Sequence, residues 1–398
     1  MLKQNWTYKK LGEVASFSRG LTFAKNDVVD ISSKKVLRSN NIDLVSHSLN
    51  FDDVACLKEG FIIPDEKKLH KGDIFICMSN GSTQHLGKVA FIEDDIDYAF
   101  GGFMGAIHPD VKEVYPKYVF YSCLSTEYRR FLASILNGIN INNLKWSELS
   151  KFTIPVPPIE TQSRIVSELD LLQSIIDKQK AQLKELDNLA QAVFYDMFGD
   201  PVENEKGWDK KMIKEIARVK IGPFGSLIHT SDYVIGGTPL VNPIHMKNGQ
   251  IYPDNNFTIS DEKKKEMESY LLKKGDVVFA RRGEIGRCAI VSEKEDGYLC
   301  GTGSLFVRFI EPISEVFVLY LTKSGSFINE LVSKAKGATM LNINCGIVED
   351  LQLSIPPISL QQSFAAKIES IEKQKVAIGK SIEETQKLFD YTMDKYFG

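Results

Sequence analysis

Apolar and polar positions recur most regularly over residues 157–199. After a double proline, apolar side chains are spaced alternately by four and three residues, which is the heptad pattern of a helix that packs along a partner helix. No helix-breaking residue occurs from 159 to 198, and Gly199 is typical of a helix end. The pattern therefore predicts one long amphipathic helix, whose apolar seam is a rod of about 50 Å.

This stretch occurs twice in the chain. The opening Pro157-Pro158-Ile159-Glu160-Thr161-Gln162 recurs as Pro356-Pro357-Ile358-Ser359-Leu360-Gln361, and the ending at Gly199 recurs at Gly398. Both pairs lie 199 positions apart, so the 398 residues form two copies of one unit. The positions expected at the contact between the two long helices are Ile165, Leu169, Leu172, Ile176, Leu183 and Leu186 in the first copy and Phe364, Ile368, Ile371, Ile378, Ile382 and Phe389 in the second.

The apolar seam of the second helix is weaker than that of the first. Lys375 stands at a seam position, and Gly379 lies in the middle of the helix, where glycine costs about 1 kcal/mol relative to alanine. A polar seam residue can fix the register of two helices at a cost in stability. The alternative is that Lys375 is a tolerated defect at a partly exposed position.

The segments that precede the two helices follow a shared order of short strands and loops. Lys71-Gly72-Asp73 and Lys274-Gly275-Asp276 each predict a turn that leads into an apolar strand. Helical patterns cover 116–137 and 315–335, and a last strand leads to each double proline. Trp6 and Trp208, in the first element of each half, are 202 positions apart. Asn40 and Asn242 have the same separation, so we expect them to be equivalent.

These patterns predict a mixed α+β fold with a pseudo-two-fold tandem repeat. The predicted boundaries are 1–156 for the first globular domain, 157–199 for the first long helix, 200–355 for the second domain and 356–398 for the second helix. The polar loops after the matched strands differ between the halves. A duplicated frame that carries unlike loops is typical of two modules that recognise different targets.

Composition excludes several classes of protein. The net charge of −3 gives no general nucleic-acid signature, so any DNA-binding face must be local. The six cysteines form no Cys-x-x-Cys pair, which argues against a zinc site or a disulfide framework. No signal peptide or apolar run of membrane-spanning length is found, and we expect a cytoplasmic protein.

The sequence contains no recognisable catalytic motif. The glycine loop from Gly81 to Lys88 is one residue too long for a phosphate-binding loop, and Val89 stands where such a loop has Ser or Thr. The double prolines are not followed by an aromatic residue, and no cofactor-binding glycine loop accompanies them. The histidines are dispersed, without a Ser/His/Asp set that spacing supports. We therefore expect no catalytic machinery of the chain's own.

The repeated motifs resemble those of a known family. The Pro-Pro-Ile-x-x-Gln openings, the Lys-Gly-Asp turn with the following strand and Ala-Arg-x-Gly-x-x-Gly-Arg at 280–287, Gly207-Trp208, and Leu-Arg-x-x-Asn-Ile at 37–42 are similar to those of the specificity subunit of type I restriction–modification systems. The resemblance covers the whole chain. It implies two target recognition domains, each reading half of a bipartite double-stranded DNA site, and two antiparallel coiled-coil helices.

The resemblance also implies the partners and cofactors. Modification (methyltransferase) subunits, expected to be two, would dock on the helix pair, and a restriction or motor subunit would complete the complex. The chain would hold no cofactor or metal itself, because S-adenosylmethionine, ATP and magnesium would belong to the partner subunits. The helix pair would set the unread gap, and the unlike loops predict an asymmetric site.

Candidate DNA-binding residues follow from the chemistry of base recognition. Arginine pairs with guanine and asparagine or glutamine with adenine in the major groove, while Lys, Ser and Thr contact phosphates. The candidates in the first half are Arg19, Arg38, Asn40, Asn41, Ser79, Asn80, Ser82, Thr83, Gln84, His85 and Asn140. In the second half they are Ser226, His229, Asn242, His245, Lys247, Arg281, Arg282, Arg287, Lys336 and Thr339. The alternative is that Arg38 and Arg287 pair with carboxylates inside the fold and that Asn40 and Asn242 satisfy turn backbone.

Three other functions compete with this one. The chain could serve a system whose partner fuses methyltransferase and nuclease, which co-purification would reveal. A stand-alone nucleic-acid-modifying enzyme would methylate DNA without partners. A coiled-coil scaffold would show no sequence-selective binding even in the assembled complex.

Overall fold

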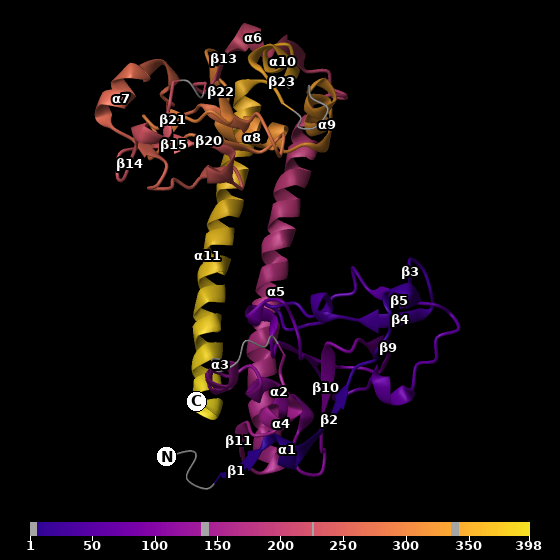
Figure 1. The fold of residues 1–398 in the computed structure, drawn as a ribbon. Helices are drawn as coiled ribbons and strands as arrows, with labels where there is room; N and C mark the ends of the chain where they lie inside the picture. The colour runs from indigo at the N-terminus through magenta and orange to yellow at the C-terminus, as the bar shows by residue number, and fades with distance from the viewer. Residues whose placement is uncertain (1–5, 137–142, 225–226, 336–341) are drawn as a thin grey trace. The chain divides into compact units, whose positions relative to one another are not determined.

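The chain forms two compact units that share the two long helices. The computed structural model describes residues 6–136, 143–224, 227–335 and 342–398. Unit 1 comprises Met1–Lys180 and Lys380–Gly398, and unit 2 comprises Ala181–Gly379. Helices α5 (Ile159–Phe198) and α11 (Ile358–Phe397) have 40 residues each, and each contributes one part to either unit (Figure 1). The prediction of two long, uninterrupted helices is confirmed.

The described residues of unit 1 form two sheets and a strand pair. The antiparallel sheet β2-β10-β7-β8 consists of β2 (Ala15–Arg19), β10 (Met104–Pro109), β7 (Ile74–Cys77) and β8 (Val89–Phe91). The sheet β3-β5-β4-β9-β6 consists of β3 (Val28–Val29), β5 (Ala55–Leu57), β4 (Lys34–Leu37), β9 (Ile96–Phe100) and β6 (Lys68–Leu69). Strands β1 (Thr7–Lys10) and β11 (Thr153–Val156) pair separately. The helices before α5 are α1 (Leu11–Val14), α2 (Pro116–Ser122), α3 (Thr126–Leu136) and α4 (Trp146–Leu149).

Unit 2 repeats the frame of unit 1. Its sheet β13-β22-β19-β20 consists of β13 (Ala217–Ile221), β22 (Ser304–Phe309), β19 (Val277–Ala280) and β20 (Cys288–Ile290). The sheet β14-β18-β15-β21 consists of β14 (Tyr233–Val234), β18 (Thr258–Ile259), β15 (Thr238–Val241) and β21 (Leu299–Cys300). Two strand pairs are β12 (Asp209–Met212) with β23 (Gln352–Ile355) and β16 (Met246–Lys247) with β17 (Gln250–Ile251). The helices are α6 (Ile213–Ile216), α7 (Asp261–Glu266), α8 (Glu315–Thr322), α9 (Gly325–Lys334) and α10 (Cys345–Glu349).

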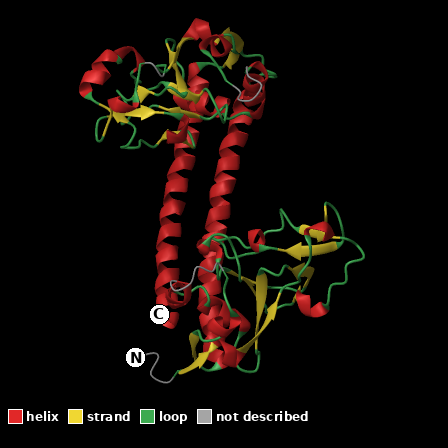
Figure 2. Ribbon diagram, in the orientation of Figure 1, coloured by secondary structure: helices red, strands yellow, loops and turns green. Residues whose placement is uncertain are grey.

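The two units confirm the predicted fold class. Both mix short strands with helices (Figure 2), and their main four-stranded sheets follow the same strand order. Each region expected to be helical, 116–137 and 315–335, is helical in its described part and forms two short helices. The reason is a serine that caps a new helix: the Ser125 hydroxyl accepts a hydrogen bond from the Tyr128 amide, and Ser324 accepts one from Phe327.

Within each unit the two long helices run antiparallel. In unit 1, Tyr396 contacts Glu168 at 2.9 Å and Gln179 contacts Ser381 at 2.7 Å, so residue numbers rise along one helix as they fall along the other. In unit 2, Asp187 pairs with Lys375, while Phe194 and Phe198 surround Phe364 with ring centroids 5.7 and 5.2 Å away.

The predicted helix-contact positions are all buried or half-buried. The buried ones are Ile165, Leu169, Leu172, Ile176, Phe364, Ile368 and Ile371, and the half-buried ones are Leu183, Leu186, Ile378, Ile382 and Phe389. The heptad pattern missed Phe194 and Phe198, which are buried in the core of unit 2. A straight helix turns once in 3.6 residues, so a seam with a strict 3.5-residue repeat drifts around its surface. Near the end of α5 the core of unit 2 therefore packs against residues outside the predicted seam.

A buried glutamine explains the Pro-Pro-Ile-x-x-Gln motif. The Gln162 side chain accepts a hydrogen bond from the Tyr115 amide at 2.8 Å and donates one to the Pro157 carbonyl at 2.8 Å. Gln361 makes the same two bonds with the Ser314 amide and the Pro356 carbonyl, again at 2.8 Å. The glutamine therefore joins the start of each long helix to the start of α2 or α8. It satisfies backbone groups that would otherwise be buried without partners.

Lys375 is held by two carboxylates in unit 2. Its ammonium group lies 2.8 Å from Asp187 on α5 and 2.8 Å from Glu372 on its own helix. Partly exposed ion pairs stabilise by about 0–1 kcal/mol. The contact with Asp187 favours the interpretation that Lys375 specifies which residue of α5 lies opposite.

Replacing Gly379 with alanine is expected to raise the free energy of unfolding by about 1 kcal/mol, because alanine is the better helix former. A Cβ atom at this position would meet no atom within 4 Å, so no clash offsets the gain. Urea denaturation measures the change. Gly286→Ala is the matched control and is expected to destabilise, because Gly286 has a φ of +94° and its Cβ would lie 3.1 Å from Ile328. A fall in stability for Gly379→Ala would contradict the prediction.

Candidate nucleic-acid interface

A close backbone contact marks the same place in both units. A Cβ atom on Gly20 would lie 2.0 Å from the Gly101 carbonyl oxygen, and one on Gly222 would lie 2.0 Å from that of Gly301. Only glycine fits at such a distance. These contacts define equivalent positions from which the neighbouring side chains of the two units can be compared.

The register beside this contact corrects one sequence expectation. The Gly101 amide donates to the Leu37 carbonyl, and the Gly301 amide donates to that of Val241, both at 2.9 Å. Arg38 is therefore equivalent to Asn242, and the expected equivalence of Asn40 with Asn242 is wrong. The segments that lead to β4 and β15 differ in length by two residues, which a constant offset does not capture.

The same comparison gives Asn41 and His245 equivalent roles inside the fold. The Arg38 amide donates to the Asn41 side chain at 2.7 Å, and the Asn242 amide donates to the His245 ring at 3.1 Å. Asn41 is 1% exposed and His245 is 4% exposed. Both side chains close a turn, so we leave them out of the candidate DNA-binding surface.

The residues that directly follow strand β7 in unit 1 and strand β19 in unit 2 carry different side chains. Met78 and Arg281 are equivalent, because their carbonyls accept from the amides of Leu144 and Ile343 at 2.7 and 3.0 Å. The next residues, Ser79 and Arg282, form matching bridges with Asn143 and Asn342. The frame is therefore preserved where the side chains change.

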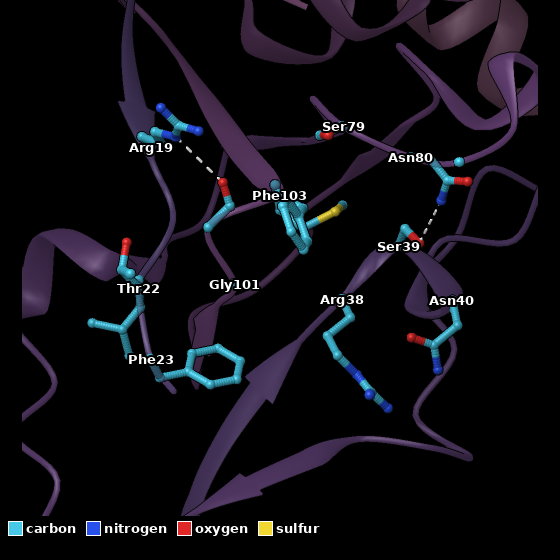
Figure 3. A pocket seen from close by; sticks show the side chains of 14 residues that line it. Arg19, Thr22, Phe23, Arg38, Ser39, Asn40, Ser79, Asn80, Gly101 and Phe103 are labelled. Atoms are coloured by element: carbon cyan, nitrogen blue, oxygen red, sulfur yellow. Dashed lines mark hydrogen bonds between the residues drawn. The ribbon is translucent and has the colours of Figure 1, made fainter. Parts of the chain in front are cut away.

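Several of the predicted residues of unit 1 surround a cavity of about 680 Å³ (Figure 3). Its lining residues are Arg19, Leu21, Thr22, Phe23, Arg38, Ser39, Asn40, Ser79, Asn80, Gly81, Gly101, Gly102, Phe103 and Met104. Arg19 is exposed and donates to the Gly102 carbonyl at 3.3 Å. The Asn80 amide donates to the Ser39 hydroxyl at 2.9 Å. The cavity thus brings together guanidinium and amide donors from three segments of the chain, at Arg19, 38–40 and Asn80.

Arg38 and Asn40 share an acidic partner on this surface. The Arg38 guanidinium lies 3.1 Å from the Asp53 carboxylate, and the Asn40 amide donates to the same residue at 3.0 Å. Both observations match the alternative reading that these side chains are satisfied within the fold. The pair is solvent-exposed, so it contributes little stability, and a phosphate or base can compete for Arg38.

The loop that follows Asn80 extends the polar surface. Ser82, Thr83 and Gln84 are exposed, whereas His85 is half-buried. The Ser82 amide donates to the Asn80 side chain at 2.9 Å, which orders the start of the loop.

The corresponding surface of unit 2 is more basic at the strand end. Arg281 lies 5.9 Å from the ring centroid of Phe224 and donates to the Asn342 side chain at 3.3 Å. Burial, with a contribution from the neighbouring Arg282, lowers the pKa of Arg281, although arginine stays protonated at neutral pH. Arg282 is exposed, and Asn242 is half-buried with its side chain accepting from the Gly303 amide at 3.1 Å.

Three further candidates in unit 2 have different surroundings. His229 and Lys247 are exposed. Arg287 donates to the Pro243 carbonyl at 3.1 Å and pairs with Glu284. Lys88, the equivalent residue of unit 1, donates to a carbonyl in the corresponding segment, that of Ile42 at 2.9 Å, so Arg287 anchors the fold as the alternative interpretation holds. Asn140, Ser226, Lys336 and Thr339 lie outside the described residues.

A hydrogen-bonded Ser–His–Asp chain escaped the sequence analysis. The Ser18 hydroxyl lies 2.7 Å from the His108 ring, whose other nitrogen lies 2.6 Å from Asp73. Asp73 also accepts from the His70 amide, which closes the Lys-Gly-Asp turn. Unit 2 has Arg308 and Asp276 at the equivalent positions, joined by bonds of 2.8 and 2.6 Å. The shared feature is a buried carboxylate with a basic partner, and this indicates a structural role.

Two exposed phenylalanines were also missed. Phe103 is 71% exposed at the unit 1 cavity, and Phe224 is 60% exposed beside Arg281. Their signal in the sequence is an aromatic residue next to the glycines of the close contact.

In the described ranges no three His, Cys, Asp or Glu side chains are arranged to hold a metal ion. None of the helices described is long and apolar enough to cross a membrane.

Comparisons with known sequences agree with the motifs. A family model described as the type I restriction modification DNA specificity domain matches residues 3–188 and 205–386. The specificity subunit of the type I restriction enzyme StySPI from Salmonella potsdam is 23% identical over 388 residues, covering 93% of this chain and 82% of that protein. The EcoKI specificity subunit from Escherichia coli K12 is 21% identical over 388 residues, with the same coverage.

Solved structures share the fold. A chain from a type I restriction–modification complex studied for its assembly and conformational transition aligns with a TM-score of 0.64 and 19% identity, covering 99% of this chain and 98% of that one. The type I specificity subunit from M. genitalium aligns with a TM-score of 0.52 and 14% identity, covering 100% and 98%. With two matched specificity domains that span most of its length, the chain belongs to the type I restriction–modification DNA specificity family.

Proposed function

We propose that this chain reads DNA for a type I restriction–modification complex and that units 1 and 2 each recognise one half of an asymmetric, bipartite site. The observation that carries the proposal is the replacement of side chains at one place on a duplicated frame. Arg38 stands where unit 2 has Asn242, and Ser79 stands where it has Arg282. Different hydrogen-bonding side chains at equivalent backbone positions would select different bases.

The two surfaces suit the major groove of DNA. In unit 1, Arg19, Arg38 and Asn80 offer donors to guanine, adenine and phosphate. In unit 2 the exposed Arg282 does so, whereas the neighbouring Arg281 is only 5% exposed. The chain as a whole carries a net charge of −3, so these local donors must act against a weakly repulsive background. Strong binding would therefore depend on partner subunits that add phosphate contacts.

The proposal assigns the chemistry to partners. Modification subunits, two in the simplest arrangement, would transfer the methyl group from S-adenosylmethionine, and a restriction or motor subunit would use ATP and magnesium. The chain itself would recognise DNA and hold the partners in a cytoplasmic complex. The antiparallel packing of α5 and α11 within each unit supports a further element of the proposal, that the helix pair sets the length of the unread gap.

Mapping methylated adenines across a genome tests the proposal. Cells that contain the modification subunits with this chain are expected to show one bipartite motif, and cells without the chain are expected to lack it. Arg282→Ala is expected to lower affinity for the site by about 1–3 kcal/mol and to relax the motif in one half only, as removal of one base contact does. Loss of selectivity in both halves at once would argue against two independent reading surfaces, and an unchanged map without the chain would overturn the proposal.

A further inference from the structure

Phe103 is held in an exposed position by its own backbone. The amides of Met78 and Ser79 both donate to the Phe103 carbonyl at 2.9 Å. The neighbouring Met104 amide donates to Gly101 at 2.8 Å, which closes the loop. The ring is nonetheless 71% exposed, so the fold fixes the residue without burying its side chain.

The cavity that Phe103 lines combines apolar and polar side chains. Leu21, Phe23 and Met104 line it, and Leu21 and Met104 are buried. The polar side chains that line it are Arg19, Arg38, Ser39, Asn40 and Asn80, which Figure 3 shows. Such a site fits a group that has an apolar projection next to a hydrogen-bond acceptor. In the major groove thymine presents this combination, with its C5-methyl group beside the O4 acceptor.

Unit 2 places an aromatic ring on its surface by a different route. The residue equivalent to Phe103 is Gly303, because the Arg281 amide donates to the Gly303 carbonyl as Met78 does to that of Phe103. The exposed ring comes instead from Phe224, which follows the close contact at Gly222 and lies 5.9 Å from the Arg281 guanidinium. Each unit therefore presents an exposed phenylalanine at this part of the frame, from a different loop, while Phe51 and Phe257 are exposed elsewhere.

Exposure alone does not single these residues out, because Ile31 and Ile62 are also exposed in unit 1. Isolated apolar side chains on a surface are ordinary. The distinguishing feature is the position of Phe103 and Phe224 among the donors that the two units place at equivalent points of the frame.

We propose that Phe103 and Phe224 each contact the C5-methyl group of a thymine, one in each half of the DNA site. This inference rests on the proposed function and adds a specificity-determining residue to each unit. The adjacent arginine and asparagine donors bind the polar edges of the bases, while the phenylalanine detects a methyl group that those donors cannot sense.

Replacement of thymine by uracil tests the inference, because the exchange removes only the methyl group. Binding is measured with the assembled complex of this chain and its modification subunits, at fixed salt, on duplexes that carry the mapped site. Each thymine of the site is replaced by deoxyuridine in turn. The wild-type complex is expected to bind about fourfold more weakly at one position in each half-site, which corresponds to the burial of one methyl group.

The two phenylalanines act as controls for each other. Phe103→Ala is expected to abolish the thymine–uracil difference in one half-site and to leave it intact in the other, and Phe224→Ala is expected to do the reverse. Phe103→Leu, which retains an apolar side chain, is expected to keep part of the difference. Both rings are exposed, so the alanine variants should fold normally, and their circular dichroism spectra check this.

Two results would overturn the inference. One is a wild-type complex whose binding does not change when uracil replaces thymine at any position. A half-site that contains no thymine counts as the same result. The other is an alanine variant that binds thymine and uracil DNA more weakly by the same factor. Sequence-selective binding in either experiment would leave the proposed function standing, whereas absence of selective binding by the wild-type complex would remove the proposed function itself.

Discussion

Replacing Arg308 with methionine is expected to lower the free energy of unfolding of unit 2 by about 3–5 kcal/mol, the cost of leaving one member of a buried ion pair alone. The Arg308 guanidinium makes two bonds, of 2.8 and 2.6 Å, to the Asp276 carboxylate. These bonds raise the pKa of Arg308. The Asp276 side chain is only 2% exposed and that of Arg308 is 32% exposed, so methionine would leave a buried carboxylate without its cationic partner.

Urea denaturation, followed by circular dichroism and by tryptophan fluorescence, measures this effect. Arg308→His is the matched control, because His108 occupies the equivalent position in unit 1 and holds the equivalent Asp73 at 2.6 Å. We expect the histidine variant to lose less than half as much stability as the methionine variant. A loss below about 1 kcal/mol for Arg308→Met, the range of a surface pair, would show that the interaction contributes little.

The parts of the fold that were predicted correctly depend on local patterns. The long helices follow from a heptad seam and a glycine stop, which neighbouring residues encode on their own. The repeat follows from motifs at constant offsets, and the Lys-Gly-Asp turns are closed by Asp73 and Asp276, which accept hydrogen bonds from the amides of His70 and Lys273. In each case the determinants lie within a few residues of the structure that they specify.

The parts that were missed depend on contacts between distant segments. Ser18 and His108 lie on β2 and β10, Asp73 lies in the turn before β7, and only the sheet brings the three together. The equivalence of Arg38 with Asn242 depends on which backbone pairs with Gly101 and Gly301, and the intervening loops differ in length. Phe194 was missed because the heptad rule assumes that one partner helix covers the whole face, whereas the core of unit 2 covers its end.

For the candidate DNA-binding surface too, the sequence predicted the features that depend on local patterns and missed those that depend on the folded chain. Strand ends and unlike loops identified Arg19, Asn80 and Arg282 as surface donors, and these residues are exposed or half-buried at the expected loops. Residue type alone could not separate them from Asn41 and His245, which have the same chemistry and serve buried turns. Burial is a property of the folded chain, and the motif that contains Asn41 gives no indication of it.

Lengthening both long helices by one heptad is expected to widen the unread gap of the DNA site by about three base pairs. Seven residues add about 10 Å of helix, and each base pair of DNA spans about 3.4 Å. The insertions belong between Lys180 and Ala181 and between Gly379 and Lys380, where one unit ends and the other begins. A heptad preserves the phase of the seam. The flanking contacts Gln179–Ser381 and Asp187–Lys375 can therefore form as before.

The genome-wide map of methylated adenines measures the gap directly. A four-residue insertion in both helices is the control, because it advances the helix by about 40° beyond a full turn and breaks the heptad phase. We expect that variant to lose methylation rather than shift the gap. If the heptad variant methylates DNA with the original gap, the helix pair does not set the spacing, and the separation of the half-sites must then be fixed by the partner subunits. The half-site sequences should be the same for wild type and heptad variant, because neither reading surface is altered.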